Sequence, residues 1–171
     1  ALEESIRTGE NAFELEHGVS VWEYRGQHLE ESEIFDRAMA SSSQVVIRSL
    51  VEAYDFGQFE TIVDVGGGNG TLLAALLAEY AGLKGVLFDQ AHVVENVDLG
   101  ERGRVVAGSF FESVPEGGDA YLLKWIIHDW EDEEAVAILR TVRQNGGALL
   151  LVEKIVDPPN EGADAKLSDL N

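Results

Sequence analysis

From residue 60 onward, short apolar runs alternate with segments of helical periodicity, and this alternation constrains the fold more than any other feature. The runs TIVDV, KGVLFDQ, GRVVAGSFF, DAYLLKWII and GALLLVEKIV are typical of buried strands. Between them, GTLLAALLAEYAG predicts a helix that stops at Gly82, and EDEEAVAILRTVRQNGG predicts another. Apolar strands that alternate with helices predict an α/β fold with a parallel sheet covered by helices on both faces.

Residues 1–55 instead carry the three- and four-residue spacing of apolar positions that is typical of helices packed on one side. The spacing is clear in EIFDRAM and QVVIRSLVEAY, and SVWE, from Ser20 to Glu23, has the pattern of a capping box. We therefore predict a helical segment that precedes the sheet domain. The last residues, KLSDLN, are typical of the opening of a helix, so we interpret the sequence as a fragment or as a chain with internal loops left out.

The acidic composition excludes several classes of partner. The chain holds 12 Lys and Arg against 32 Asp and Glu, a formal net charge of −20, so nucleic acid is not an expected partner. It has no cysteine, and its four histidines show no ligand spacing, so no metal site is predicted. The apolar runs are too short to span a bilayer and the N-terminus lacks a signal-peptide pattern, which predicts a soluble, cytoplasmic protein without a membrane partner.

A glycine cluster follows the first predicted strand in the sequence IVDVGGGNG. Gly66, Gly68 and Gly70 have G-x-G-x-G spacing, whereas the dinucleotide fingerprint G-x-G-x-x-G would require a glycine at Thr71. Such a loop lets a ligand approach the backbone and offers it the free amides of a helix N-terminus. Asp64, just before the loop, favours a cationic or hydroxyl-bearing ligand over a pyrophosphate. The alternative is a tight strand-to-helix turn with no ligand.

A second acid, Asp89, ends the second predicted strand, at the distance from the glycine loop that a ribose-binding carboxylate has in nucleotide-binding sheets. A carboxylate there can accept both hydroxyls of a ribose; the alternative is an ordinary N-cap for the following helix. Together, the loop and Asp89 predict an adenosine-type ligand at the carboxyl edge of the sheet.

Four motifs carry a resemblance to a known family: VDVGGGNG, GVLFDQAHVV, GSFFESVP and KWIIHDWEDEEAVAILR. In this order they resemble the successive motifs of S-adenosylmethionine-dependent O-methyltransferases that act on small molecules. The nearest likeness is to bacterial enzymes that methylate phenolic or polyketide hydroxyls, with plant phenolic methyltransferases as wider relatives. The resemblance extends from RTGENAF to the C-terminus of the chain.

The resemblance implies a class I methyltransferase fold with a Rossmann-like sheet, an S-adenosyl-L-methionine cofactor, and a small aromatic or polyketide-type acceptor that carries a hydroxyl. It also implies secondary metabolite biosynthesis and a homodimer of the full-length protein, whose N-terminal dimerisation domain is mostly missing from this chain, together with the C-terminal end. Residues 1–55 would form a helical linker that lines the substrate pocket, and residues 56–171 would form the cofactor-binding domain.

Ten residues match family positions that contact the cofactor: Asp64, Gly66, Gly68, Asp89, Gln90, Ser109, Phe110, Phe111, Lys124 and Trp130. The glycines would face the methionine part, with Asp64 supporting the loop, and Asp89 would take the ribose hydroxyls with Gln90 beside the adenine. The two phenylalanines would wall the adenine, Lys124 would line the far side of the cofactor, and Trp130 would stack near it. Many relatives have an aspartate in place of Ser109, whose hydroxyl can still bond to the adenine amino group.

His128 is the predicted general base. It follows the fourth predicted strand at the edge where α/β sheets bind ligands. An imidazole pKa of about 6.5 lies well below a phenol's value of about 10, so the base must act in concert with methyl transfer or be strengthened by a carboxylate. The resemblance assigns that carboxylate to Glu153, in LLLVEK, and places a second one beyond Asn171. The alternative for His128 is a histidine that caps the next helix or bonds a carbonyl, and the alternative for Glu153 is a strand-end acid at the surface.

Three further residues match acceptor-binding positions: Met39, Trp125 and Asp129. A methionine adapts well to flat aromatic substrates, although Met39 could equally be part of a core. Trp125 is either core or pocket wall, and its indole N–H needs a partner in both cases. Asp129 either touches the substrate or leads into the acidic start of the next helix.

Two other functions compete with methyl transfer. The first is an NAD(P)-dependent oxidoreductase on a Rossmann-like fold; the G-x-G-x-G spacing and the absence of a Tyr-x-x-x-Lys pair argue against it. The second is a catalytically silent relative that binds S-adenosylmethionine and serves assembly or regulation. The presence of both His128 and Glu153 argues against that interpretation.

Overall fold

The computed structural model describes residues 1–156 and Pro158, without the side chains of residue 36 and residues 38–45. Two compact units make up the chain, Ala1–Val45 and Val46–Asn171. The predicted roles of residues 1–55 as a pocket segment and of residues 56–171 as a cofactor domain stay predictions. The closing KLSDLN stretch, for which the sequence predicts the start of a helix, lies outside the described residues.

The first unit is helical, as the sequence predicts. It contains α1 (Leu2–Thr8), α2 (Ala12–His17), α3 (Val21–Gln27) and the beginning of α4 (Leu29–Ala53). The Ser20 hydroxyl accepts a hydrogen bond from the N–H of Glu23 at 3.2 Å, which caps α3 and confirms the serine half of the predicted capping box. Left-handed glycines follow the first two helices, at Gly9 and Gly18.

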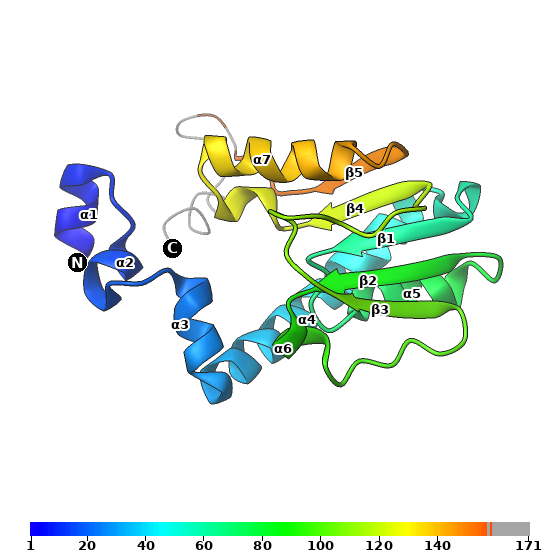
Figure 1. Cartoon of the computed structure of the whole chain (residues 1–171), viewed down its shortest axis with the longest axis horizontal. Helices are drawn as coiled ribbons and strands as arrows, with labels where there is room; N and C mark the ends of the chain where they lie inside the picture. Colours follow the sequence, from blue (N-terminus) through cyan, green and yellow to red (C-terminus); the bar gives the residue numbers. More distant parts are fainter. Residues whose placement is uncertain (157, 159–171) are drawn as a thin grey trace. The chain divides into compact units, whose positions relative to one another are not determined.

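The second unit is built on a five-stranded parallel sheet, which confirms the predicted fold class. Its strands are β1 (Thr61–Val65), β2 (Lys84–Asp89), β3 (Gly103–Ala107), β4 (Ala120–Lys124) and β5 (Ala148–Val152), in the order β3-β2-β1-β4-β5 (Figure 1). Because every pair is parallel, all five carboxyl ends lie at the same edge. The strand order reverses between β1 and β4, and such a reversal is where open α/β sheets bind their ligands.

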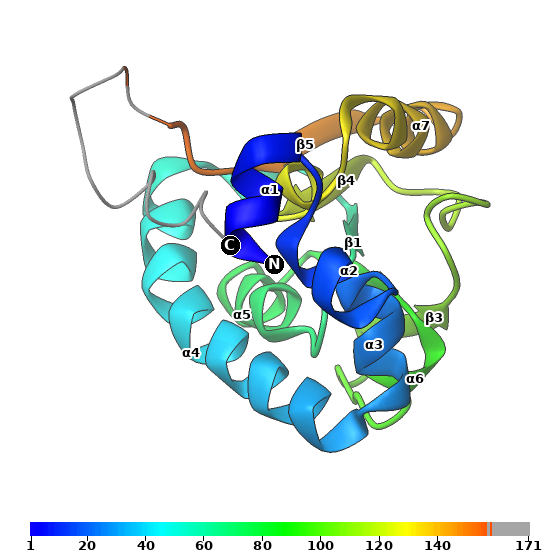
Figure 2. The same cartoon turned by 90° about the vertical axis from the view of Figure 1, so that its left-hand side faces the viewer.

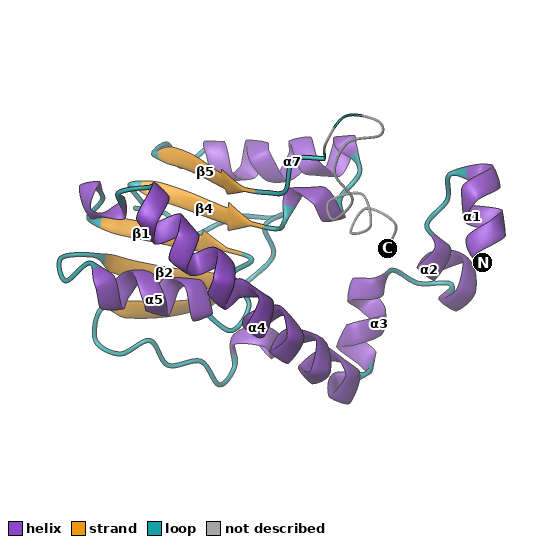
Figure 3. Ribbon diagram, turned by 180° about the vertical axis from the view of Figure 1, so that it is seen from behind, coloured by secondary structure: helices purple, strands orange, loops and turns teal. Residues whose placement is uncertain are grey.

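Helices cover both faces of this sheet. Helix α5 (Thr71–Glu79) and the end of α4 pack on one face, in a core that includes Ile47 and Leu76. Helix α7 (Asp132–Arg143) packs on the other face through Ile138 and Val142. Figure 2 shows α5 and α7 on opposite sides of the strands, and in Figure 3 α5 lies in front of them. Both faces of the central strands are therefore buried, which explains why their sequence is apolar at most positions.

The remaining elements are short and connect the strands. The crossover between β2 and β3 contains only the short helix α6 (Ala91–Val94). This agrees with the small number of residues between these two strands. Two 3₁₀ helices, η1 (Phe56–Gln58) and η2 (Ile127–Asp129), precede β1 and follow β4.

Helix α5 ends earlier than predicted. The sequence predicts a stop at Gly82, but the helix ends at Glu79, and Tyr80 follows in an extended conformation. The Arg102 guanidinium donates hydrogen bonds to the carbonyl oxygens of Leu77 and Tyr80, so it satisfies carbonyls that the helix end leaves free. A left-handed glycine is not needed when a side chain supplies these donors.

The fourth strand is also shorter than predicted. The run DAYLLKWII is apolar almost throughout, but β4 ends at Lys124, and Trp125 has a φ of 57°. This left-handed residue turns the chain out of the ladder into η2, so Ile126 and Ile127 lie beyond the strand. An apolar run indicates burial, but it does not show at which residue the backbone leaves a sheet.

Candidate active site

Apart from Met39, which belongs to α4, the predicted site residues lie at or near the carboxyl ends of the five strands. Gly66 follows β1, Asp89 ends β2, Ser109 lies just beyond β3, Lys124 ends β4 and Glu153 follows β5. Because the strands are parallel, the fold brings these residues from distant parts of the sequence to one edge. The edge includes the β1–β4 boundary where the strand order reverses, so it is the position at which this fold class binds ligands.

The glycine loop between β1 and α5 is packed at one residue and open at another. Gly66 (φ 69°) donates to the carbonyl of Phe88 at 2.8 Å, and a Cβ at this position would lie 2.5 Å from Ile126 Cδ1. A Cβ at Gly68 (φ 61°) would meet nothing within 4 Å among the described atoms. A ligand can therefore approach the backbone at Gly68, whereas Gly66 is packed against Ile126.

Asp64 lies in β1 beneath this loop. Its side chain is 1% exposed, and within the described structure neither carboxylate oxygen has a hydrogen-bond partner. A Cβ at Gly67 would lie 2.6 Å from its Oδ2, so the bare glycine backbone covers the carboxylate. Burial raises the pKa of Asp64 to about 7; the Lys124 ammonium opposes this shift and the Asp89 carboxylate adds to it.

Asp89 links the glycine loop to the end of β2. Its Oδ2 accepts a hydrogen bond from the N–H of Gly68 at 2.8 Å, and its Oδ1 accepts one from the N–H of Gln90 at 2.7 Å. A carboxylate has about four acceptor sites, so these two bonds do not use its full capacity. Gln90 itself is the N-cap residue of α6, which shows that the alternative interpretation of Asp89 as the N-cap is wrong.

Phe110, Phe111 and Trp130 form a cluster of three rings that pack edge to face. The ring centroids are 5.1 Å apart between the two phenylalanines, and Trp130 lies 5.7 and 4.7 Å from them. Phe111 is 41% exposed, so part of the cluster is open to a ligand. The Ser109 hydroxyl accepts from the N–H of Phe111 at 3.3 Å. An aromatic surface of this kind can hold a planar ring or a cation.

Lys124 and Trp125 contact each other at the end of β4. The Lys124 Nζ lies 3.9 Å from the centroid of the half-buried Trp125 ring, a cation–π geometry. Burial lowers the pKa of Lys124, and the carboxylates of Asp64 and Glu153 oppose that shift. The ammonium therefore interacts electrostatically with both the buried acid beneath the loop and the acid beyond β5.

His128 and Glu153 form a direct pair. The His128 Nδ1 lies 2.6 Å from Glu153 Oε2, while Oε1 accepts hydrogen bonds from the N–H groups of Ile126 and Ile127 at 3.0 and 2.9 Å. A carboxylate can only accept, so Nδ1 is the donor, and the neutral imidazole presents Nε2 as an acceptor. The His128 side chain is 53% exposed, so a substrate can reach it.

Asp129 lies next to the other imidazole nitrogen. Its Oδ1 is 3.4 Å from Nε2 of His128, so carboxylates flank the ring on both sides. It also precedes the acidic first turn of α7, as the alternative interpretation requires. Met39 belongs to α4, but its side chain lies outside the described part of the structure, so its place in an acceptor pocket stays a prediction.

The sequence did not predict two parts of this site. The first is the pair of amides, from Ile126 and Ile127, that bind Glu153; every residue carries such a donor, so the residue types give no signal. The second is Gly67, whose missing side chain leaves room for the Asp64 carboxylate and for Leu87. The run of three consecutive glycines was the available signal for Gly67. The G-x-G-x-G spacing gives no reason for a glycine at this middle position.

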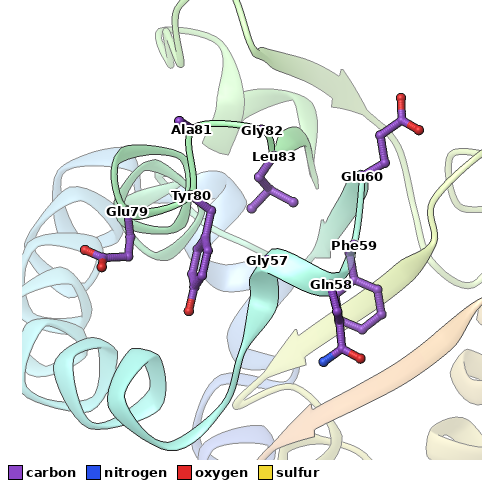
Figure 4. Close-up of a pocket in the computed structure, with 9 residues that line it drawn as sticks. All are labelled: Gly57, Gln58, Phe59, Glu60, Glu79, Tyr80, Ala81, Gly82 and Leu83. Atoms are coloured by element: carbon purple, nitrogen blue, oxygen red, sulfur yellow. The ribbon is translucent and has the colours of Figure 1, made fainter.

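A separate pocket lies at the opposite edge of the sheet. It has a volume of about 490 Å³ and is lined by residues 57–60, which precede β1, and residues 79–83, which precede β2 (Figure 4). The predicted site residues are not among those that line it. Parallel sheets bind ligands at their carboxyl ends, so we assign the chemistry to the other edge.

Two further observations concern the described residues alone. They contain no group of three or more His, Cys, Asp or Glu side chains that could hold a metal ion. Within the same part of the chain, every helix is too short or too polar to cross a membrane.

Comparison with known proteins identifies relatives over the whole chain. A family model described as "O-methyltransferase domain" matches residues 1–171. Phenazine O-methyltransferase PhzM of Lysobacter antibioticus is 38% identical over 177 aligned residues, which cover 98% of this chain and 52% of that protein. The chain thus spans about half the length of the curated relatives it matches.

Solved structures show the same likeness. The crystal structure of LaPhzM has a TM-score of 0.94 and 37% identity, and the match covers 99% of this chain and 54% of that one. The O-methyltransferase NcsB1 from neocarzinostatin biosynthesis, solved in complex with S-adenosylmethionine and 2-hydroxy-5-methyl naphthoic acid, has a TM-score of 0.82 and 37% identity, with 89% of this chain and 50% of that one covered.

Proposed function

This chain belongs to the O-methyltransferase domain family, and from that premise we propose that its protein transfers a methyl group from S-adenosyl-L-methionine to a hydroxyl of a small aromatic or polyketide-type acceptor. The observation that carries the proposal is the convergence, at one sheet edge, of an acid-flanked glycine loop and the 2.6 Å His128–Glu153 pair. The first is suited to a cofactor and the second to proton removal from a hydroxyl.

The residues present fit this cofactor better than a pyrophosphate-containing one. The carboxylate of Asp64 is buried without a hydrogen-bond partner in the described structure, and Asp89 binds the amide of Gly68. The Asp64 carboxylate, just before the loop, attracts cationic or hydroxyl-bearing groups and repels phosphate, whereas Asp89 suits the ribose of either cofactor. The loop residues Gly66 to Gly70 also contain no Lys or Arg that could offset that repulsion. The oxidoreductase alternative therefore has less support.

We assign the parts of the cofactor to the described residues. Asp64, Gly66 and Gly68 would hold the methionine part, and Asp89 and Gln90 the ribose and adenine. Beyond β3 and β4, the adenine and sulfonium would lie against a second group of residues: Ser109, Phe110, Phe111, Lys124 and Trp130. The partly exposed ring cluster in this group supports that assignment, since aromatic faces hold both planar bases and onium cations.

His128 would remove the acceptor's proton. When bound, S-adenosyl-L-methionine would supply a methyl group on a sulfonium sulfur. The acceptor hydroxyl would donate its proton to Nε2 of His128 while its oxygen bonds to the methyl carbon and the carbon–sulfur bond breaks, which would leave the neutral thioether S-adenosylhomocysteine. Glu153, at 2.6 Å from Nδ1, keeps the ring in the required tautomer and stabilises the imidazolium that results.

The acceptor itself is assigned by class alone. Asp129, which lies beside Nε2 of His128, and Trp125, which lies beside Lys124, would contact the acceptor, and Met39 is the third proposed contact. A homodimer of the full-length protein, a cytoplasmic location and a place in secondary metabolism complete the proposal; these rest on the resemblance to the family.

Calorimetric titration of the full-length protein tests the cofactor. We expect S-adenosyl-L-methionine to bind and NAD(H) and NADP(H) to give no heat of binding. Tight binding of a nicotinamide cofactor, with no response to S-adenosyl-L-methionine, would contradict the proposal. A protein that binds the cofactor but transfers no methyl group to any acceptor would be the catalytically silent relative.

A further inference from the structure

Trp125 has a backbone conformation that large side chains rarely adopt. Its φ is 57°, and among the described residues it is the one non-glycine with a positive φ. Ile126, the next residue, is right-handed, with φ −113° and ψ −49°. A left-handed residue followed by a right-handed one turns successive N–H groups toward the same side, and this forms a concave site for an anion.

The anion in this concavity is Glu153. The N–H groups of Ile126 and Ile127 both donate to its Oε1, at 3.0 and 2.9 Å. In an extended strand, successive amides point to opposite sides, so one oxygen could not receive both. The second oxygen, Oε2, remains for Nδ1 of His128 at 2.6 Å.

Trp125 is the residue at which the backbone changes partner. Its own N–H still donates to the carbonyl of Val152 at 2.9 Å, so the β4–β5 ladder extends to this point. The next two N–H groups donate to the side chain of Glu153 instead, one residue beyond Val152. The turn at Trp125 thus determines whether these amides face the sheet or the carboxylate.

We propose that Trp125 is a positioning residue, whose left-handed backbone forms the amide cradle that holds Glu153 against His128. The inference rests on the proposed function for the role of His128 as a base, whereas the cradle is a property of the backbone. Backbone strain of this kind is concentrated at functional sites, where the surrounding structure maintains it.

The test must separate the backbone of Trp125 from its ring, because the indole also contacts Nζ of Lys124 at 3.9 Å. Trp125→Asn and Trp125→Val both remove the indole. Asparagine adopts the left-handed region readily, whereas a β-branched valine does so with strain. The pair therefore differs in the one property that the proposal concerns.

Turnover of the full-length protein is the first measurement. We expect kcat of Trp125→Val to be about tenfold or more below that of Trp125→Asn, with the same Kd for S-adenosyl-L-methionine in both, because misplacement of catalytic groups lowers turnover strongly. In a Glu153→Gln background, the difference between the two variants should shrink to less than about twofold, because a glutamine held in the cradle no longer offers Nδ1 of His128 a carboxylate oxygen. Equal kcat values in the unmodified background would overturn the proposal.

Nitrogen-15 NMR of histidine-labelled protein gives a readout that needs no activity. The His128 signals are assigned by their loss in His128→Gln. We expect an Nδ1–H tautomer in the wild type and in Trp125→Asn, and a mixture of tautomers in Trp125→Val. If the two variants differ in the His128 tautomer but the protein transfers no methyl group, the cradle is supported and the proposed function fails. Identical His128 signals in both variants would overturn the cradle.

A second pair of variants keeps the test possible if Trp125→Val does not fold. Trp125→Gly and Trp125→Ala also lack the indole, and glycine favours the left-handed backbone more than alanine does. The same order, with glycine above alanine in kcat and in the share of the Nδ1–H tautomer, supports the proposal. Equal values for glycine and alanine overturn it.

Discussion

Glu153 uses both carboxylate oxygens, so its replacement by glutamine is informative at the residue scale. The glutamine oxygen can still accept from the amides of Ile126 and Ile127, but its NH₂ group then faces Nδ1 of His128. We expect Glu153→Gln to lower kcat by about 100-fold or more, with the affinity for S-adenosyl-L-methionine retained, because the imidazole loses its required tautomer. Steady-state kinetics and calorimetry measure the two quantities.

The matched control for this prediction is Glu101→Gln, which changes an exposed glutamate in the turn before β3. It should leave kcat within about twofold of the wild type, since surface substitutions of this kind have small effects. A similar loss of kcat in both variants would show that the effect does not come from the His128 pair.

The raised pKa of Asp64 leads to a prediction about proton release when the cofactor binds. Burial raises its pKa to about 7, so near neutral pH a large share of the folded molecules carry a protonated Asp64. A cationic ligand bound nearby favours the carboxylate and lowers this pKa, so binding of S-adenosyl-L-methionine at pH 7 should release roughly half a proton. Calorimetry in two buffers with different ionisation enthalpies measures the release, and Asp64→Asn should abolish it. An unchanged release in that variant would exclude Asp64 as the source.

At the residue scale, the sequence predicts which residues belong to the site better than it predicts their contacts. His128 and Glu153 were assigned through motifs, and the structure places Nδ1 and Oε2 within 2.6 Å. The motifs could not show that Asp64 lacks a hydrogen-bond partner in the described structure, or that Asp89 binds the amide of Gly68. Both facts depend on the three-dimensional path of the loop, which the residue types alone do not determine.

At the scale of elements, the glycine loop allows stability to be separated from binding. Gly68 and Gly100 both have a positive φ, 61° and 69°, and a Cβ at either position would meet nothing within 4 Å among the described atoms. Gly68→Ala and Gly100→Ala should therefore each reduce the free energy of unfolding by about 1–2 kcal/mol. Only Gly68→Ala should weaken binding of S-adenosyl-L-methionine, by about tenfold or more, because its methyl group projects into the proposed site.

Denaturant unfolding and calorimetric titration measure these two effects. Equal loss of cofactor affinity in Gly68→Ala and Gly100→Ala would mean that strain in the fold, rather than contact with the ligand, controls binding. Equal affinity of Gly68→Ala and wild type would place the ligand away from this part of the loop.

The hydrophobic pattern of the sequence predicted which segments form helices and strands, but it predicted poorly the residues at which they end. All five strands occur where the apolar runs lie, and burial on both faces explains the continuous pattern of the central strands β1, β2 and β4. The ends of α5 and β4 were wrong for a common reason. A guanidinium from Arg102 terminates the helix, and the left-handed Trp125 terminates the strand, so a distant side chain or a backbone angle overrides the local sequence.

At the scale of the whole molecule, the buried Asp64 should affect stability as a function of pH. Its pKa is raised from 3.8 to about 7 by folding, so the folded state binds more protons than the unfolded state between these values. The free energy of unfolding should therefore fall as pH rises from about 4 to about 7, by a few kcal/mol relative to Asp64→Asn, and then run parallel to that of the variant. Urea unfolding at fixed protein concentration across this pH range measures the difference. Parallel curves throughout would contradict the burial of an ionisable Asp64.

Methyl transfer by the full-length protein tests the central claim most directly. The assay follows label from methyl-labelled S-adenosyl-L-methionine into a panel of phenols, polyketides and hydroxylated isoprenoids, with the wild type and His128→Ala compared at equal cofactor saturation. We expect the wild type to label a hydroxyl of at least one acceptor, and His128→Ala to bind the cofactor equally while its turnover falls by about 10²- to 10⁴-fold. Equal turnover by the two proteins, or cofactor binding by the wild type with no transfer to any acceptor, would contradict the account.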